Sequence, residues 1–287
     1  MNAPRPSPHA SVVSLHDDLV QRIETGRLEL PLLNDTAAKV MNLCSDASCD
    51  ARRLAELIQR DQALAGHVLR IANSAAYAPS EPIVSLQQAV SRMGLTVMRD
   101  MALAIAVKGK VFSAKGFEAQ IRELWLHSAS AGAWAKEIAR LRRRNVEGAF
   151  LSGLMHDVGK PVVLQAALDL CREAERSVDT NTLHAWLDQH HTQVGAQLLE
   201  HWSMPEWMRS ATLWHHEPER APEETSEVAA TVCLADLLSH WSLADGKTSE
   251  ESLRQHPVLA RLSLYTEDID ELCARREQVS LISKALL

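Results

Sequence analysis

Residues 147–161 read EGAFLSGLMHDVGKP. The apolar residues of this segment recur at the spacing of one helix face: Ala149, Phe150 and Leu154. Asp157 falls on the same face at the end of the expected helix, beside His156. Because burying a carboxylate is unfavourable unless it is paired or binds a cation, the segment predicts a helix over 146–157 that ends in a polar site.

The sequence on both sides of this segment also predicts helices. The 287 residues include only 11 Gly and 11 Pro, aromatic residues are 4%, and Ala, Leu, Glu, Gln and Arg recur throughout, which favours helix over strand. We therefore expect an all-α protein. A first helix follows Ser14 and ends at Gly26, and Gly94 separates a helix from Ser85 and one from Thr96. Helices expected in the second half span about 117–141, 146–157, 161–175, 180–187, 191–202, 205–216 and 226–242.

Composition excludes several classes of protein. Apolar residues are 46% and charged residues 23%, as in ordinary globular chains. The longest apolar run, Met101–Val107, is far shorter than the roughly 20 residues of a membrane-spanning helix. The start, MNAPRPSPHASVV, lacks the apolar region of a secretory signal, so we expect a cytoplasmic protein. No C-x-x-C spacing joins the five cysteines, which predicts free, mostly buried thiols: Cys44, Cys49, Cys171, Cys233 and Cys273.

The charge balance argues against nucleic acid as a partner. The formal net charge is −7, whereas phosphate contacts need a basic face. One basic cluster lies where a helix is expected to end: Arg140, Arg142, Arg143 and Arg144. Cations at that end complement the helix dipole, so we interpret the cluster as a helix-end feature and not as a phosphate-binding patch.

Five ionisable residues lie on apolar helix stripes and are predicted to point inward: His127, Asp157, His191, His215 and Asp236. A single inward histidine is usually a hydrogen-bonded core residue. Two inward carboxylates among several histidines instead form a set that a cation would stabilise, and a His–Asp hydrogen-bond network is the alternative. Nitrogen and oxygen ligands without thiolate are compatible with one or two ions of Fe, Mn, Zn, Co or Mg.

The HDVGK sequence of 156–160 resembles the HD motif of the HD superfamily of metal-dependent phosphohydrolases. The order of several longer motifs resembles the HDOD family, the HD-related output domain of bacterial signalling proteins. These motifs are RDQALAGHVLRIANSAAY (60–77), SLQQAVSRMGL (85–95), LWLHSASAGAWA (124–135), HHTQVGAQLLEHWSMP (190–205) and LWHHEPE (213–219). The resemblance covers roughly 28–240 and implies an HD-like helical domain packed on an N-terminal helical subdomain.

This resemblance divides the chain into four parts: a flexible tail (1–13), an N-terminal helical part (14–110), an HD-like part (111–245) and C-terminal helices (246–287). It implies a metal set of His127, His156, Asp157 and Asp236, extended by His191 and His215 as in the two-metal HD-GYP enzymes, where the Asp of the HD pair bridges the ions. Lys160 matches a lysine that contacts substrate phosphate, so Lys160 and Asp157 are the catalytic candidates if the chain is active. Glu123 also matches an HD-GYP ligand position, but we interpret it as an exposed helix residue, and His190 and His216 as neighbours of the site.

Two functions follow from the resemblance; we expect the first, and the second is the alternative. The first is a signal-transduction output domain, such as the output part of a response regulator, which acts through an unidentified protein partner or a ligand and is compatible with a homo-oligomer. The second is a metal-dependent phosphohydrolase. The chain retains the ligand residues that many HDOD members lack, but the segment after His216, EPERAPEE, has no GYP motif and would repel a phosphodiester.

Overall fold

A computed structural model describes residues 8–32, 38–40, 50–77, 79, 81–112 and 114–287. All regular structure in these ranges is helical, so the all-α prediction is confirmed. The helices are α1 (Pro8–Glu24), α3 (Ala51–Gln59), α4 (Gln62–Ala72), α5 (Leu86–Val111), α6 (Glu118–Leu141), α7 (Val146–Met155), α8 (Gly159–Glu173), α9 (Thr180–His201), α10 (Glu206–Trp214), η1 (Pro218–Arg220), α11 (Glu223–Leu243), α12 (Glu250–Arg254), α13 (Val258–Arg261), α14 (Thr266–Ala274) and α15 (Arg276–Ala285).

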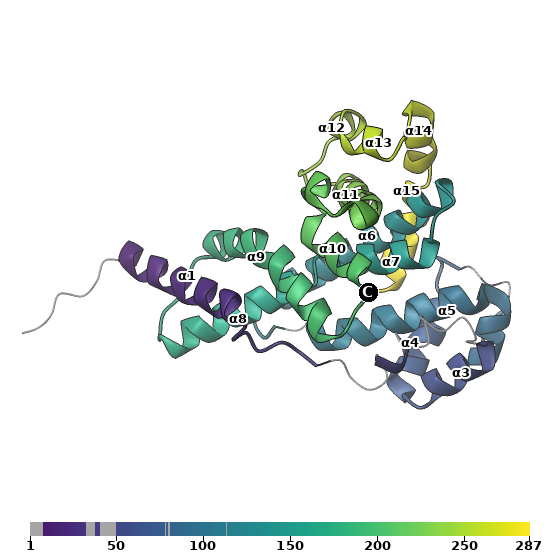
Figure 1. Ribbon diagram of the computed structural model, residues 1–287. Helices are drawn as coiled ribbons and strands as arrows, with labels where there is room; N and C mark the ends of the chain where they lie inside the picture. Colours follow the sequence, from purple (N-terminus) through teal and green to yellow (C-terminus); the bar gives the residue numbers. More distant parts are fainter. Residues whose placement is uncertain (1–7, 33–37, 41–49, 78, 80, 113) are drawn as a thin grey trace, which may run out of the picture.

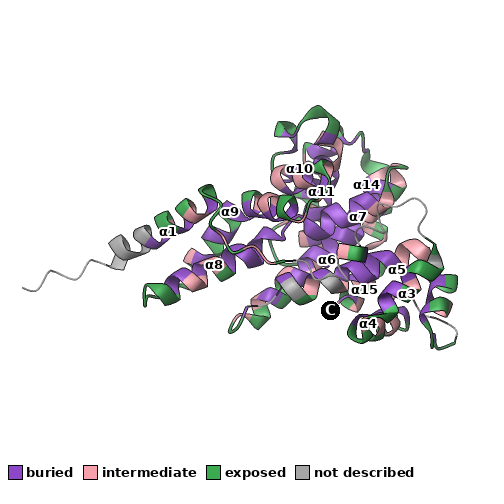
Figure 2. Ribbon diagram, turned by 60° about the horizontal axis from the view of Figure 1, so that its bottom comes forward, coloured by how far each residue is buried: buried purple, intermediate pink, exposed green. Residues whose placement is uncertain are grey.

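The HD-like half is built around α6 and α7, which are buried along most of their length (Figure 2). Helices α8 and α9 pair with each other on one side, and α10 and α11 cover another (Figure 1). Helices α3–α5 pack on one another and contact this half through α5, whereas α1, which the sequence placed in the same N-terminal part (14–110), packs on α8. Five of these helices or their ends, α6, α7, α9, α10 and α11, contribute side chains to one polar cluster in the interior.

The break expected at Gly94 is present as a kink inside α5. Gly94 has φ of 83° and ψ of 161°, a conformation that side-chain-bearing residues rarely adopt, and the helix continues on both sides. The two expected helices are therefore the two stretches of α5 on either side of Gly94; Thr96 lies at the start of the second, and its hydroxyl donates to Glu147 Oε1 at 2.7 Å. The kink therefore directs the second half of α5 toward α7.

Further differences from the expected helices concern the start of α1, the continuity of α9 and the place of Pro205. Helix α1 begins at Pro8, before Ser14. The helices expected over 180–187 and 191–202 are one helix, α9, because the three residues between them carry no glycine or proline to interrupt it. Pro205 is the residue before α10 and not its first residue. The acidic stretch that follows α10, residues 217–227, contains η1 and the start of α11.

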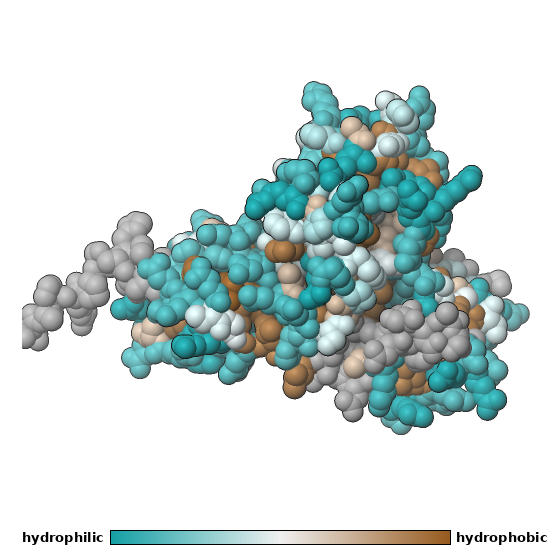
Figure 3. Space-filling model, viewed as in Figure 1, coloured by the Kyte–Doolittle hydropathy of each residue, from teal (hydrophilic) through white to brown (hydrophobic). Residues whose placement is uncertain are grey.

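Ion pairs account for most of the basic cluster at the end of α6. Arg142 and Arg144 both contact Glu227, at 2.5 and 2.7 Å, and Arg140 contacts Glu137. These contacts support the reading of the cluster as a helix-end feature. The face shown in Figure 3 is mainly hydrophilic, with apolar residues scattered over it.

Cys171 and Cys233 are buried free thiols and Cys273 is a half-buried one, whereas Cys44 and Cys49 lie outside the described residues. Across the described ranges, none of the helices combines the length and apolar character needed to cross a membrane.

Candidate metal centre

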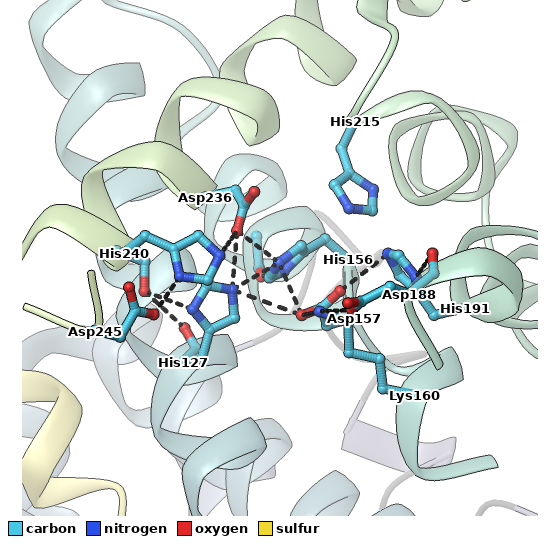
Figure 4. A network of polar contacts seen from close by, with 12 residues as sticks. His127, His156, Asp157, Lys160, Asp188, His191, His215, Asp236, His240 and Asp245 are labelled. Carbon is cyan, nitrogen blue, oxygen red and sulfur yellow. Dashed lines mark hydrogen bonds and ion pairs between the residues drawn. The ribbon is translucent and has the colours of Figure 1, made fainter. Parts of the chain in front are cut away.

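The structure brings together all six of the side chains that the sequence singled out as ligands (Figure 4). They come from five helices and their ends: His127 on α6, His156 and Asp157 after α7, His191 on α9, His215 after α10 and Asp236 on α11. Each of these residues is at most 8% exposed, and His156 and His215 are fully buried. A core that buries so many ionisable groups needs compensation for their lost hydration.

One group of ligand-type atoms forms around His127 and His156. The two Nε2 atoms lie 3.2 Å apart. Asp236 Oδ1 lies 2.9 Å from His127 Nε2, and Asp157 Oδ2 lies 3.5 Å from His156 Nε2. Neighbouring ligands that each lie about 2.1 Å from one ion are about 3 Å from each other, so this spacing suits a single first-row divalent ion.

A second group lies on the other side of Asp157. His191 Nε2 is 3.1 Å from His216 Nε2, and the ligand atoms of His191, His215 and His216 all lie within 4.8 Å of one another. Asp157 faces both groups, because Oδ2 points to the first and Oδ1 lies 3.3 Å from His191 Nε2. If both groups held an ion, the Asp157 carboxylate would offer one oxygen to each group.

The hydrogen bonds of the imidazoles leave lone pairs that no described donor satisfies. Nδ1 of His191 donates to the Leu187 carbonyl at 2.9 Å, so Nε2 of the neutral ring is an acceptor. His216 Nε2 can donate to it at 3.1 Å, and a second acceptor, Asp157 Oδ1, lies 3.3 Å away. Nδ1 of His215 donates to Thr212 O at 2.8 Å, and its buried Nε2 has no hydrogen-bond partner among the described residues; the same is true of Asp157 Oδ1. A cation between these atoms satisfies them all, so the residues fit a metal ion.

The electrostatics of the cluster favour the protonation states that bind metal. Burial by itself raises the pKa of Asp157 and of Asp236, but neighbouring imidazoles, together with Lys160 in the case of Asp157, outweigh it and hold both well below the ordinary value. Burial lowers the pKa of His191 to about 4 and that of His215 well below its ordinary value. At neutral pH the carboxylates are therefore ionised and these two imidazoles are neutral, as metal ligands must be.

His156 differs from the other imidazoles. Burial lowers its pKa, but the carboxylates of Asp157 and Asp236 outweigh that effect and raise it. Without a cation, His156 thus supplies part of the positive charge that the two carboxylates need, and a bound ion would take over that role.

Lys160 occupies the edge of the cluster on the first turn of α8. Its Nζ lies 2.7 Å from Asp157 Oδ2 and 3.9 Å from Asp188 Oδ1. Burial lowers the pKa of Lys160, but Asp157 outweighs this effect and raises it, so the side chain stays charged. A fixed cation beside a ligand carboxylate is suited to contact an anionic group.

Two residues of the cluster were not among the predicted ligands. His216 was expected to be only a neighbour, yet its Nε2 belongs to the second group. His240 was not singled out, although it follows Asp236 by one helical turn on α11, which is the signal that could have identified it. Glu123 is exposed, and His190 contacts His16 Nε2 at 3.0 Å on another face of α9, so neither belongs to the described groups.

The profile of the HDOD domain family matches residues 30–218, about two thirds of the chain. An uncharacterised protein of Treponema pallidum is 24% identical over 233 residues, which cover 78% of this chain and 44% of that protein. The chain thus spans less than half the length of this relative.

Two solved structures have a similar fold. One, from Shewanella amazonensis, is named as a candidate metal-dependent phosphohydrolase; it is 18% identical, with a TM-score of 0.73 over 96% of this chain and 99% of the other. Another, from Marinobacter aquaeolei, is named as a candidate signal transduction protein; it is 24% identical, with a TM-score of 0.68 over 98% of this chain and 66% of the other. Because the family profile covers about two thirds of the chain, the chain belongs to the HDOD family.

Proposed function

We propose that this HDOD protein is a metal-dependent phosphohydrolase. The proposed ligands are the six residues predicted from the sequence together with His216. The observation that carries the proposal is that two buried acceptors of the cluster, Asp157 Oδ1 and His215 Nε2, have no hydrogen-bond partner among the described residues. A purely hydrogen-bonded core would place a donor beside each of these atoms.

Divalent ions in such a site supply Lewis acidity, which polarises a phosphoryl oxygen and makes water nucleophilic near neutral pH. The residues of the chain contribute orientation and charge. Backbone carbonyls fix the ring planes of His156 and His191 by accepting from Nδ1, at 2.7 and 2.9 Å. Lys160 holds a positive charge where a substrate phosphate would lie, and so lowers the repulsion between that phosphate and Asp157.

Activity toward phosphate esters tests this proposal. Metal-free protein is reconstituted separately with Mn²⁺, Fe²⁺, Zn²⁺ and Mg²⁺ and assayed with bis(p-nitrophenyl) phosphate, nucleotides and cyclic dinucleotides. We expect hydrolysis with at least one ion, and its loss in Asp157→Asn. Protein that contains stoichiometric metal and cleaves none of these esters would contradict the enzymatic function while leaving the metal centre in place.

A second candidate function is a regulatory output domain in which the metal centre is structural. Two ion pairs favour it, because they join α5 of the N-terminal subdomain to α6 and α7, the helices that lead into the cluster. Asp100 on α5 contacts Lys136 on α6 at 2.8 Å, and Arg99 on α5 contacts Glu147 on α7. A displacement of α5 would therefore move α6, which carries His127, and α7, which His156 directly follows.

The two functions differ in what the metal ligands do in the cell. For a regulatory domain, a folded His156→Ala, Asp157→Ala variant should complement a deletion of the gene, that is, return the cells to the wild-type phenotype. For a phosphohydrolase, the same variant should fail to complement the deletion, although the variant protein is present at the wild-type level. A partner protein captured equally by both forms would support the regulatory function.

A further inference from the structure

His240 lies at the edge of the first group, opposite Lys160 (Figure 4). Its ring stacks on that of His127, with centroids 4.3 Å apart and an interplanar angle of 28°. Its Nε2 is 3.4 Å from Asp236 Oδ1, and the ligand atoms of His127, Asp236 and His240 all lie within 4.8 Å of one another. The side chain is only 13% exposed, so the ring is held in the wall of the site.

The other ring nitrogen of His240 is held by a carboxylate. Nδ1 is hydrogen-bonded to Asp245 Oδ2 and must be the donor, because an ionised carboxylate only accepts. In the neutral ring the lone pair then lies on Nε2, on the side of Asp236. A histidine backed by a carboxylate and aimed by its free nitrogen at other ligand atoms is the usual arrangement of a metal ligand.

Asp245 is itself fixed by the turn that ends α11. Ala244 adopts a left-handed conformation, with φ of 55°, and reverses the chain so that Asp245 returns to His240. Asp245 Oδ1 accepts from the backbone N–H of Lys247 at 3.0 Å, and this leaves Oδ2 for His240. Both carboxylate oxygens are thus engaged, and the orientation of the His240 ring is determined by this turn.

The ring of His240 matches the imidazoles of the proposed ligands in one further respect. His156, His191 and His215 each donate from Nδ1 to a backbone carbonyl and present Nε2 to the cluster. His240 does the same with a stronger acceptor, a carboxylate. Its Nε2 faces Asp236 Oδ1, which is also an acceptor, and a cation between them would relieve this contact.

We infer that His240, whose Nδ1 is held by Asp245, is a further ligand of an ion bound by His127 and Asp236. It would complete the site on the side of the turn that follows α11. The inference rests on the metal-binding part of the proposed function and adds a residue that the resemblance to HD enzymes did not supply. It assigns the segment after α11 a role in the centre: the turn at Ala244 sets the donor strength and orientation of one ligand.

Cobalt binding tests this ligand directly. Metal-free wild type, His240→Ala, Asp245→Asn and a control, His184→Ala, are titrated with Co²⁺, and the affinity, visible spectrum and hyperfine-shifted ring-proton NMR signals are recorded. His184 is exposed on α9, so His184→Ala removes one imidazole outside the cluster and is the matched control. Circular dichroism and melting temperature show which variants are folded, and Asp245→Asn keeps the shape of the side chain if His240→Ala does not fold.

We expect His240→Ala to weaken Co²⁺ binding by about ten- to a hundred-fold, to change the spectrum and to lose one shifted exchangeable ring proton. Millimolar imidazole should restore the spectrum, because it can occupy the vacated position. Asp245→Asn should weaken binding by about ten-fold, and His184→Ala should behave as wild type.

A folded His240→Ala protein with the wild-type affinity and spectrum would overturn the inference and make His240 an imidazolium bridge between two carboxylates. Wild type that binds no Co²⁺ would overturn both the inference and the metal centre. Wild type that binds Co²⁺ through His240 but hydrolyses no phosphate ester would support the inference and overturn only the phosphohydrolase function.

Discussion

The Cα of Gly159 lies so close to the carbonyl oxygen of His191 that a Cβ at this position would meet that oxygen at 2.0 Å. The glycine of the HDVGK sequence thus permits α8 to pack directly on α9, which carries His191. Gly159→Ala should separate the two helices, lower the free energy of unfolding by about 1–3 kcal/mol or more, and weaken metal binding. Urea denaturation and metal titration measure both effects.

A matched control for this substitution is Gly66→Ala. Gly66 is exposed inside α4, and a Cβ there meets no atom within 4 Å. Alanine favours helix over glycine, so Gly66→Ala should leave metal binding unchanged and raise stability by up to about 1 kcal/mol. Equal effects of the two substitutions would contradict the packing argument.

Lys160→Met should separate catalysis from metal binding. The substitution removes the charge 2.7 Å from Asp157 Oδ2 but retains most of the side-chain volume. We expect kcat/KM for phosphate esters to fall by about ten- to a hundred-fold while the metal content stays at the wild-type level, because one charge-assisted contact to phosphate contributes about 1.5–3 kcal/mol. Lys115→Met, at an exposed position, is the control. Unchanged kinetics in Lys160→Met would remove Lys160 from the substrate site.

Asp100 should make stability depend on pH. Burial raises its pKa to about 6, although the charges of Lys136 and Arg99 oppose the shift. The folded state therefore binds this proton more tightly than the unfolded state, whose Asp pKa is 3.8. The stabilising contribution is complete below the unfolded value and is lost as pH rises through about 6.

Compared with Asp100→Asn, wild type should lose about 1 kcal/mol of unfolding free energy between about pH 5 and about pH 7. Denaturant titrations of both proteins across this range provide the measurement. Parallel pH profiles for the two proteins would show that Asp100 does not titrate in this window.

Arg275 should anchor the C-terminal helices to α6 through a buried carboxylate. Glu137 is 3% exposed in its side chain, and its Oε2 lies 2.6 Å from Arg275 Nη1. Arg275→Met should cost about 1–3 kcal/mol, less than a fully buried pair because Arg275 is one-third exposed and Arg140 also contacts Glu137. Adding Glu137→Gln should recover part of this loss in a double-mutant cycle; simply additive losses would mean that the two residues are not coupled.

Helical spacing predicted the interior position of most of the site. His127 shares a stripe with Ala131 and Trp134, and the structure buries all three. This success has a physical reason: an amphipathic helix reports which face turns inward, whatever it packs against. The same reasoning could not show that the five helices and helix ends meet at one point, since that depends on close approaches such as Gly159 against His191.

Residues beyond helix ends were harder to predict. Helix α10 ends at Trp214, so both His215 and His216 turn toward the second group although adjacent residues of a helix would diverge. His240 is one turn from Asp236, but its partner Asp245 depends on the left-handed residue at Ala244, which no periodicity indicates. The break expected between 187 and 191 was wrong because those residues are compatible with a continuous helix.

The central claim is that the buried His–Asp cluster is a metal centre. Elemental analysis of protein purified without chelator or metal-affinity resin tests it most directly, together with the His156→Ala, Asp157→Ala variant and circular dichroism of both. We predict one to two equivalents of a divalent metal in wild type and their loss in a variant that stays helical. Wild type without metal, even after reconstitution with Mn²⁺, Fe²⁺, Zn²⁺ or Mg²⁺, would contradict the claim and leave the cluster as a hydrogen-bonded core.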